Sequence, residues 1–192
     1  MMKKLSKLLF VLGLLFIIAS GVLAVKYYLN ANNEENMILV KELYDMMPKG
    51  ENGIILDIDD EMPIVEIHQE NFVGVISIPK YNRTLPIGAL WNNDILTKYP
   101  SVYLGTLYDG SLIISATDSK NQLDFMKTIS EDDVVLISDM KGKKFSYIID
   151  EIEITKDVST EHLISDKHDL VIFVKNTYSF DYTILKCKYK II

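Results

Sequence analysis

The side chains that could act as a nucleophile, a general base or a metal ligand are few in this chain. Cys187 is the only cysteine, so no internal disulfide can form. The three histidines, His68, His162 and His168, lack the i, i+4 or C-x-x-C spacing that arranges ligands around a metal ion. Arg83 is the only arginine and follows "IPKYN". The sequence therefore predicts neither a metal site nor a cofactor.

Lys175 closes the apolar run "LVIFVK" and is followed by the polar residues "NTYS". A buried strand of this kind can deliver one reactive side chain to a site at its tip. Two interpretations follow: Lys175 is itself a chemical group, or it occupies a position where a different residue type would do the chemistry.

Short runs rich in Ile, Val, Tyr and Phe predict the elements that would position such groups. Turn signals such as Pro79, Gly110 and Ser179 separate these runs. The predicted strands are residues 72–79, 83–88, 110–117, 132–140, 143–154, 169–175 and 181–192. The spacing of apolar residues predicts short helices at 37–50, 92–99 and 121–129. Seven or eight short strands with one to three small helices predict a mainly β fold, a closed β-barrel.

The first 27 residues have a different composition from the rest. Lys3, Lys4 and Lys7 precede the uncharged apolar stretch 8–25, whose 18 residues span about 27 Å as a helix. This length is close to the hydrocarbon thickness of a bilayer, and the lysines favour a cytoplasmic N-terminus. A signal peptide cleaved after Ala24 is the alternative. In either case the domain that follows leaves the cytoplasm.

These features divide the chain into four predicted parts. They are a short cytoplasmic basic segment (1–7), a single-pass transmembrane signal-anchor (8–27), a linker with a short helix (28–65) and a β-barrel domain (66–192). Within the linker, the polar run "NANNEEN" at residues 30–36 predicts a flexible spacer between the membrane and the domain.

Beyond the first 27 residues the chain is strongly acidic. Those residues hold four lysines and no acid, so the remainder carries a net charge of −11. Such a surface repels nucleic acid, whose binding needs basic groups that neutralise phosphates. Asp57, Asp59 and Glu61 have the spacing of a calcium-binding loop, but Met62 stands where that loop needs glycine. We interpret this stretch as a solvated acidic segment.

Four stretches, taken in order, resemble the sortases, the membrane-anchored cysteine transpeptidases of Gram-positive bacteria. "NFVGVISIPKYNRTLPI" (71–87) matches the family's G-x-[IL]-x-I-P segment and the L-P-[IV] after it. "ALWNNDILTKYPSVYLGTLYDGSLIISAT" (89–117) matches a branch with a tryptophan, P-x-x-Y-x-G-[ST] and the histidine strand. Residues 131–154 match the hairpin that follows, and 169–188 match the strands that hold the nucleophile and the arginine. The resemblance implies a sortase barrel from residue 72 onward and an N-terminal anchor.

The resemblance also implies three catalytic groups. They are a cysteine that forms an acyl-enzyme, a histidine that transfers protons and an arginine that stabilises the oxyanion. In this chain the histidine position falls on Thr117 and the cysteine position on Lys175. The arginine position falls on Tyr182, or on Thr183 because the preceding turn is one residue short. None of these side chains has the required chemistry, so we expect no catalytic residues at a degenerate site.

Other residues of the chain are poor substitutes for the three groups. Cys187 lies five residues after Tyr182 on the same predicted strand, so it points to the opposite face and is expected to be a buried structural thiol. His162 and His168 fall in the connection before the nucleophile strand, where surface histidines are expected. Arg83 is expected to be a surface charge.

Thr117 and Lys175 are expected to face each other, with Asp118 beside them. A hydroxyl and a neutral lysine can form a nucleophile–base pair. A neighbouring carboxylate, however, holds a lysine in its charged form. The favoured interpretation is therefore an ordinary ion pair of Lys175 with Asp118, or a solvent-exposed Lys175.

The sequence thus predicts a membrane-anchored extracytoplasmic, sortase-like protein that binds a peptide or protein in cell-surface anchoring or assembly. The possible peptide cleft consists of Thr117, Asp118, Lys175, Asn176, Tyr182 and Thr183. The expected partners are the membrane and a sorting-signal peptide, a pilin or an active sortase, and not nucleic acid. An active transpeptidase or hydrolase of sorting peptides with non-standard residues is the alternative. A structural envelope protein without peptide binding is a third hypothesis.

Overall fold

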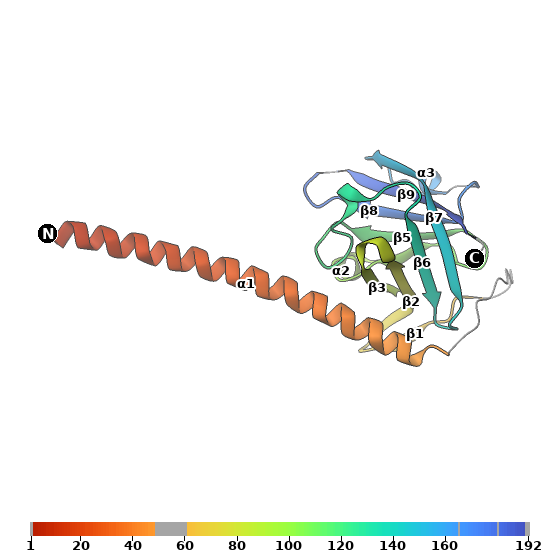
Figure 1. Ribbon diagram of the computed structural model, residues 1–192, viewed down its shortest axis with the longest axis horizontal. Coiled ribbons are helices and arrows are strands. Elements are labelled where there is room, and N and C mark those ends of the chain that lie inside the picture. The colour runs from red at the N-terminus through yellow and green to blue at the C-terminus, as the bar shows by residue number, and fades with distance from the viewer. Residues whose placement is uncertain (1, 49–60, 165, 180, 191–192) are drawn as a thin grey trace.

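The computed structural model describes residues 2–48, 61–164, 166–179 and 181–190. It shows one long helix that leads into a β-barrel (Figure 1). The strands are β1 (Val65–Ile67), β2 (Glu70–Ile78), β3 (Arg83–Gly88), β4 (Ser101–Leu104), β5 (Leu112–Thr117), β6 (Val134–Asp139), β7 (Lys144–Thr155), β8 (Leu170–Lys175) and β9 (Tyr182–Tyr189). The helices are α1 (Met2–Met46), α2 (Asn93–Leu96), α3 (Thr160–Leu163) and the 3₁₀ helices η1 (Pro79–Tyr81) and η2 (Met126–Thr128).

Eight of the described strands close into a barrel. Their order is β2-β3-β4-β5-β8-β9-β7-β6, and β2 also pairs with β6, while β1 forms a hairpin with β2 beside this ring. Gly74 lies at the β2–β6 seam, where an added Cβ would sit 2.2 Å from the carbonyl oxygen of Ser138. The seam can therefore close only around a residue without a side chain. The expected mainly β fold, a closed barrel of seven or eight strands, is confirmed.

The predicted strands match β2, β3 and β5 to β9 within a few residues at each end. The short strands β1 and β4 were not predicted from the sequence. The predicted helix at 121–129 is wrong for most of its length, because only Met126–Thr128 form a 3₁₀ turn. In this segment the buried Gln122 side chain bonds to other elements: its Oε1 accepts from the Thr117 N–H at 3.0 Å, and its Nε2 donates to the Leu96 carbonyl at 2.6 Å.

Strand β8 is buried on both faces, which explains its unbroken apolar run. Leu170, Ile172 and Val174 belong to the apolar core inside the barrel. Val171 and Phe173 point the other way, into a second cluster that helix α3 covers with Leu163. We call this second side of β5, β8 and β9, which includes Ile113 and Ile184, the outer face.

Helix α1 is continuous from Met2 to Met46, so residues 30–36 are helical and the predicted flexible spacer is wrong. The predicted short helix at 37–50 is the last part of α1. Leu39 and Leu43, one helical turn apart, are buried against Phe72 and Val75 of β2. Docking on the barrel stabilises the helical state of a segment whose Asn residues would otherwise favour turns.

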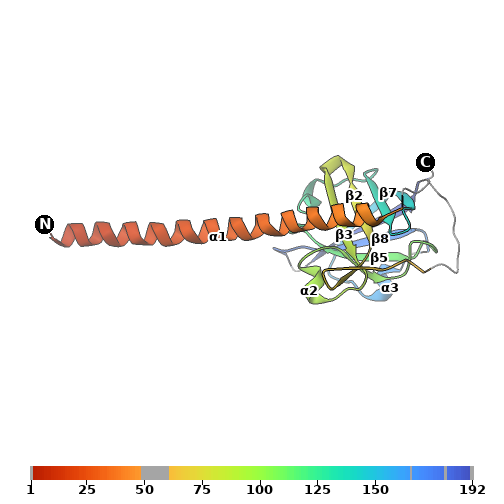
Figure 2. The same ribbon diagram turned by 90° about the horizontal axis from the view of Figure 1, so that it is seen from below.

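The contacts of α1 also give its direction along the barrel. The Nδ2 of Asn36 donates to the carbonyl oxygens of Lys98 and Asn121, each at 3.2 Å. Leu43, two turns later, packs in the same cluster as Met140 of the β6–β7 turn. We call the end of the barrel that meets Asn36 the proximal end, and the end at Met140 the distal end. The first half of α1 projects away from the proximal end (Figures 1 and 2).

One helix of the described chain is long and apolar enough to cross a membrane, with its most apolar window at Phe10–Tyr27 and no part of that window buried. The acidic stretch that was interpreted as solvated, with Asp57 and Asp59, lies outside the described residues, and its last acid, Glu61, is exposed.

Candidate functional site

The three positions that resemble the catalytic residues of sortases lie side by side. Strands β5 and β8 are parallel, and Thr117 at the end of β5 is the register partner of Lys175 at the end of β8. Strands β8 and β9 are antiparallel, and Lys175 is in turn the register partner of Tyr182 at the start of β9. A single row across three strand ends thus holds a hydroxyl, an ammonium group and a phenol, all at the proximal end.

The side chains of this row lie on the outer face. Thr117 and Lys175 have the same strand parity as Ile113 and Phe173, and the Tyr182 ring lies 6.2 Å from the Phe173 ring. Thr183 points to the opposite side and is buried. Of the two residues that could match the arginine position, only Tyr182 therefore shares a face with Lys175.

Within the described residues, neither Thr117 nor Lys175 has a contact that would activate its side chain. Thr117 Oγ1 lies 2.8 Å from Ser119 Oγ, and Lys175 is exposed. Asp118 accepts a hydrogen bond from the backbone N–H of Thr177 at 2.7 Å and a second one from its hydroxyl. Within the described chain the carboxylate of Asp118 therefore bonds to Thr177, and it forms no ion pair with Lys175. Of the two favoured interpretations, solvent exposure of Lys175 is the one observed.

The rest of the predicted cleft is the loop between β8 and β9. Asn176 Nδ2 donates to Asp181 Oδ1 at 2.6 Å, and Thr183 Oγ1 donates to Asn176 Oδ1 at 3.3 Å. Ser179 also donates to Asp181. The hydrogen bonds from Ser179 and Asn176 lower the pKa of the Asp181 carboxyl, and slight burial opposes them only in part. The loop thus folds back on itself around one carboxylate.

Cys187 lies far from this row along the strand. It is the register partner of Leu170, at the opposite end of β8 from Lys175, and its side chain belongs to the barrel interior. Burial, assisted by the negative charge of Asp150, raises the pKa of the thiol. The predictions that Cys187 is buried and that it faces away from Tyr182 are confirmed.

Two of the histidines, His162 and His168, and the arginine contact carboxylates elsewhere. His162 Nε2 lies 2.9 Å from Glu153 Oε1, in a half-buried pair on helix α3 and strand β7. His168 is buried, 3.1 Å from Asp150 Oδ2, so its predicted surface position is wrong. Arg83, the predicted surface charge, pairs with Asp124 at 2.6 Å and is half-buried.

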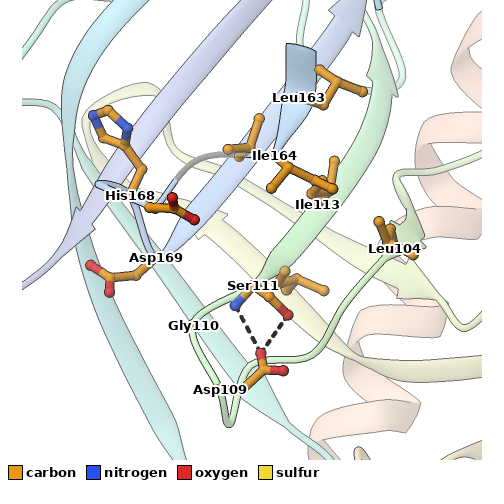
Figure 3. Close-up of a pocket in the computed structure, with 12 residues that line it drawn as sticks. Leu104, Asp109, Gly110, Ser111, Ile113, Leu163, Ile164, His168 and Asp169 are labelled. Carbon is orange, nitrogen blue, oxygen red and sulfur yellow. Dashed lines mark hydrogen bonds between the residues drawn. The ribbon is translucent and has the colours of Figure 1, made fainter. Parts of the chain in front are cut away.

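A pocket of about 350 Å³ opens on the outer face near the starts of β5 and β8 (Figure 3). Ile113 and Val171 are buried in it, and Leu163 and Ile164 form one wall. Asp109, on its rim, accepts hydrogen bonds from the backbone and side chain of Ser111 (Figure 3). No sequence motif marks this pocket, because its residues come from two separate connections, before β5 and before β8, and from the strands beside them.

The pocket and the row of Thr117, Lys175 and Tyr182 are two ends of the same outer face. Ile113 precedes Thr117 by four residues on β5, and Val171 precedes Lys175 by four residues on β8. Four residues of strand span about 13 Å, so an extended peptide of four or five residues could contact both. Between them lie Phe173 and Tyr103, whose rings are 5.1 Å apart in an edge-to-face arrangement.

No family model and no curated protein matches the sequence. Solved structures do match the fold. Sortase C from Clostridium perfringens, in a structure with the C-terminal cell wall sorting motif, is 20% identical with a TM-score of 0.56, over 85% of this chain and 88% of that one. Sortase C1 from Streptococcus agalactiae is 18% identical with a TM-score of 0.55, over 66% and 72%. Sortase A from Listeria monocytogenes is 12% identical with a TM-score of 0.53, over 62% and 88%. The barrel of this chain therefore has the sortase fold.

Proposed function

We propose that this chain is a membrane-anchored extracytoplasmic protein with a sortase-like barrel that binds an extended peptide without transferring it. One observation carries the proposal: the three adjacent strand-end positions hold Thr117, Lys175 and Tyr182. The three positions are adjacent, as a shared site requires, but none of the three side chains is a thiol, an imidazole or a guanidinium group.

Acyl transfer at this position would need a nucleophile, a proton carrier and an oxyanion donor within reach of one carbonyl group. Among the residues that the structure describes, the Thr117 hydroxyl bonds to the hydroxyl of Ser119 and not to a base. Lys175 is exposed, whereas catalytic lysines are activated by desolvation in an apolar pocket or by a second cation beside them. Cys187 is enclosed in the barrel. These facts support a degenerate site.

Peptide binding is supported by the shape and composition of the outer face. At one end it offers a pocket lined by apolar side chains and by the acids Asp109, Asp166 and Asp169. The ring of Tyr103, which packs on the buried Phe173, lies in the middle, and the exposed Lys175 lies at the other end. Apolar pockets with a few polar groups at their edge are typical ligand sites. The solved Clostridium perfringens sortase C with a cell wall sorting motif supports a peptide of that kind as the ligand. In that case the partner is a surface protein with a sorting signal or a pilin, and an active sortase is a further candidate.

The membrane anchor is supported by the apolar window Phe10–Tyr27 and by the lysines that precede it. Apolar helices of this length cross bilayers, and lysines on one side keep that side in the cytoplasm. With the N-terminus inside, the barrel lies outside the cell membrane.

The proposal is tested with the full chain in detergent micelles, incubated with a library of sorting-type peptides and an amine acceptor. We expect binding without cleavage or transfer. Lys175→Glu should weaken the binding of peptides with a carboxylate at that end, whereas Lys144→Glu, an exposed position on β7 near the distal end, should not. Two charges at about 4 Å near a protein surface interact by a few kcal/mol at most, so a loss of about tenfold is expected.

Turnover of any peptide that disappears in Thr117→Ala or Lys175→Met would contradict the proposal and establish an enzyme with non-standard residues. Absence of binding across the whole library would instead favour a structural protein. A triple variant, Thr117→His with Lys175→Cys and Tyr182→Arg, gives a positive control: labelling by an electrophilic peptide would show that the three positions still have a catalytic geometry.

A further inference from the structure

The distance between the membrane-spanning part of α1 and the barrel is short and fixed. Asn36 is buried and bonds to the backbone of Lys98 and Asn121, which lie at the proximal end. The apolar window ends at Tyr27, nine residues earlier on the same helix. Nine residues of α-helix rise about 13.5 Å. The proximal end therefore lies about that far from the hydrocarbon of the bilayer.

The lipid headgroups occupy part of this distance. A bilayer is about 30 Å thick across its hydrocarbon and about 40–45 Å with its headgroups, which leaves roughly 5–7 Å of headgroup on each side. The gap between the headgroup layer and the level of Asn36 is then about 6.5–8.5 Å. A loop of moderate length at the proximal end would close this gap.

The loop between β8 and β9 is at the proximal end and points in this direction. Asn121, which α1 contacts, is four residues after Thr117, and Thr117 is adjacent to Lys175, where the loop begins. Two views at right angles show the loop on the side of the barrel toward which the free half of α1 projects (Figures 1 and 2). Tyr178 is three residues beyond Lys175, and three residues reach at most about 10 Å when extended.

Exposed apolar side chains are found at the same end. Tyr178 is 94% exposed, although the barrel provides several aromatic clusters that could receive it. Ile154, near the end of β7, is 70% exposed, and its register partner Thr183 is next to Tyr182 at the foot of the loop. Asp118 and Asp181 are charged, but both carboxylates accept hydrogen bonds from the β8–β9 loop, and the exposed acids Glu34 and Glu35 lie on α1 instead.

We propose that the proximal end of the barrel rests on the bilayer surface, with Tyr178 in the lipid headgroup layer and Ile154 at its edge. The inference depends on the membrane anchor of the proposed function but not on peptide binding. Tyrosine suits this layer because its ring is apolar and its hydroxyl can bond to headgroups or water. The partner of this surface is thus the lipid itself. In consequence the row of Thr117, Lys175 and Tyr182 opens toward the membrane.

Nitroxide labels on single cysteines test this arrangement in the full chain, reconstituted in vesicles of phosphatidylcholine and phosphatidylglycerol. The variants are Tyr178→Cys at the loop tip, Lys144→Cys near the distal end and Ala24→Cys within the apolar window. The buried Cys187 does not compete for the label. Collision of each label with lipid-soluble oxygen and with a water-soluble nickel chelate reports its depth.

We expect the label at position 24 to collide mainly with oxygen, the label at 144 mainly with the nickel chelate, and the label at 178 to fall between them, at the depth of the headgroups. If the labels at 178 and 144 are equally accessible to the chelate while that at 24 is protected, the surface contact is wrong and the anchor stands. If the label at 24 is also accessible to the nickel chelate, the chain has no membrane anchor at this helix, and the proposed contact of the barrel with the bilayer is wrong as well.

A second variant separates a bilayer contact from mere protection by the protein. Seven alanines inserted between Asn33 and Glu34 add two helical turns, or about 10.5 Å, without changing the barrel. The label at 178 should then become as accessible to the nickel chelate as the label at 144. Unchanged protection after the insertion would contradict the proposal, because it would arise from the fold and not from lipid.

Discussion

Cys187 lies in the barrel interior, where strands β7, β8 and β9 surround it. A thiol attacks carbonyl groups as its thiolate, and burial raises the pKa of this one. At the strand-end position next to Thr117, by contrast, the chain carries the exposed Lys175. The chain thus has a thiol, but the thiol is buried at Cys187 and is absent from the exposed strand-end position that Lys175 occupies.

This difference predicts how thiol reagents react with the protein. The folded natural chain should resist labelling by a maleimide and should become reactive only when urea unfolds it. The variant Lys175→Cys should take up one label per chain in the folded state, and mass spectrometry of the intact protein measures both. Labelling of Cys187 in the folded natural chain would contradict its enclosure in the barrel.

Asp133 is a second residue whose position determines its chemistry. It accepts hydrogen bonds from Lys80 Nζ at 2.7 Å, from Tyr81 Oη at 2.9 Å and from the backbone N–H of Ser130 at 3.0 Å. Burial would raise the pKa of this carboxyl, but the bonds from Lys80, Ser130 and Tyr81 outweigh burial and lower the pKa. The charged form of Asp133 therefore holds the turn between β2 and β3 in contact with the loop before β6.

The lowered pKa of Asp133 predicts a loss of stability in acid. Because the folded pKa lies below the unfolded value of about 3.9, the contribution is complete above that pH and is lost as the pH falls through the folded pKa. The natural chain should lose stability to urea more steeply below pH 4 than Asp133→Asn does. Asp124→Asn, at an exposed acid that pairs with Arg83, is the matched control. Parallel curves for the natural chain and Asp133→Asn would contradict the assignment.

How much of the site the sequence predicts can be judged at single residues. The adjacency of Thr117 and Lys175 follows from the resemblance to sortases, and the register confirms it. The choice between Tyr182 and Thr183 needed the strand register, because a turn one residue shorter moves every following side chain to the other face. The burial of His168 was missed because a loop of polar residues gives no periodic signal.

Helix α1 is the element that the sequence described least well. Its residues 30–36 are polar and rich in Asn, which indicates a spacer, and only contacts with the barrel show otherwise. Asn36 is nearly enclosed and uses its amide to bond two backbone carbonyls. Strands β1 and β4 were missed for a related reason: each has three or four residues and depends on a neighbouring strand for its hydrogen bonds. Tertiary contact thus overrides local propensity in these elements.

Docking of α1 on the barrel can be measured with one pair of variants. Leu43 is fully buried in the cluster with Phe72 and Met140, whereas Ile38, on the same helix, is 56% exposed. Leu43→Ala should lower the free energy of unfolding by about 2–4 kcal/mol, because it removes transfer energy and leaves a cavity. Ile38→Ala should change it by less than about 0.5 kcal/mol. Urea unfolding of the full chain in detergent, followed by near-ultraviolet circular dichroism, measures both.

Equal effects of Leu43→Ala and Ile38→Ala would mean that α1 does not dock on the barrel. The helix would then be free to tilt, and neither the proximal end nor the β8–β9 loop would have a fixed distance from the bilayer. The proposed contact of the proximal end with the bilayer therefore requires that α1 docks on the barrel through Leu43.

At the scale of the whole molecule, the chain combines a basic, apolar front with a strongly acidic remainder. The first 27 residues contain four lysines and no acid, and the rest carries a net charge of −11. Figure 1 shows the same division in space, with the apolar half of α1 extending away from the barrel. Lysines before a span favour the cytoplasmic side, so the proposed function expects the acidic barrel on the outer side of the membrane.

This polarity predicts the orientation of the chain in a cell membrane. In intact bacterial cells, a maleimide that cannot cross membranes should label Lys144→Cys on the barrel but should label Ser6→Cys only after the cells are permeabilised. Replacement of Lys3, Lys4 and Lys7 by glutamine should reduce the fraction of correctly oriented chains, because the signal that retains the N-terminus is weakened. If Ser6 is absent from the mature protein by mass spectrometry, the front of the chain is a cleaved signal peptide, and the barrel is released from the membrane instead of resting on it.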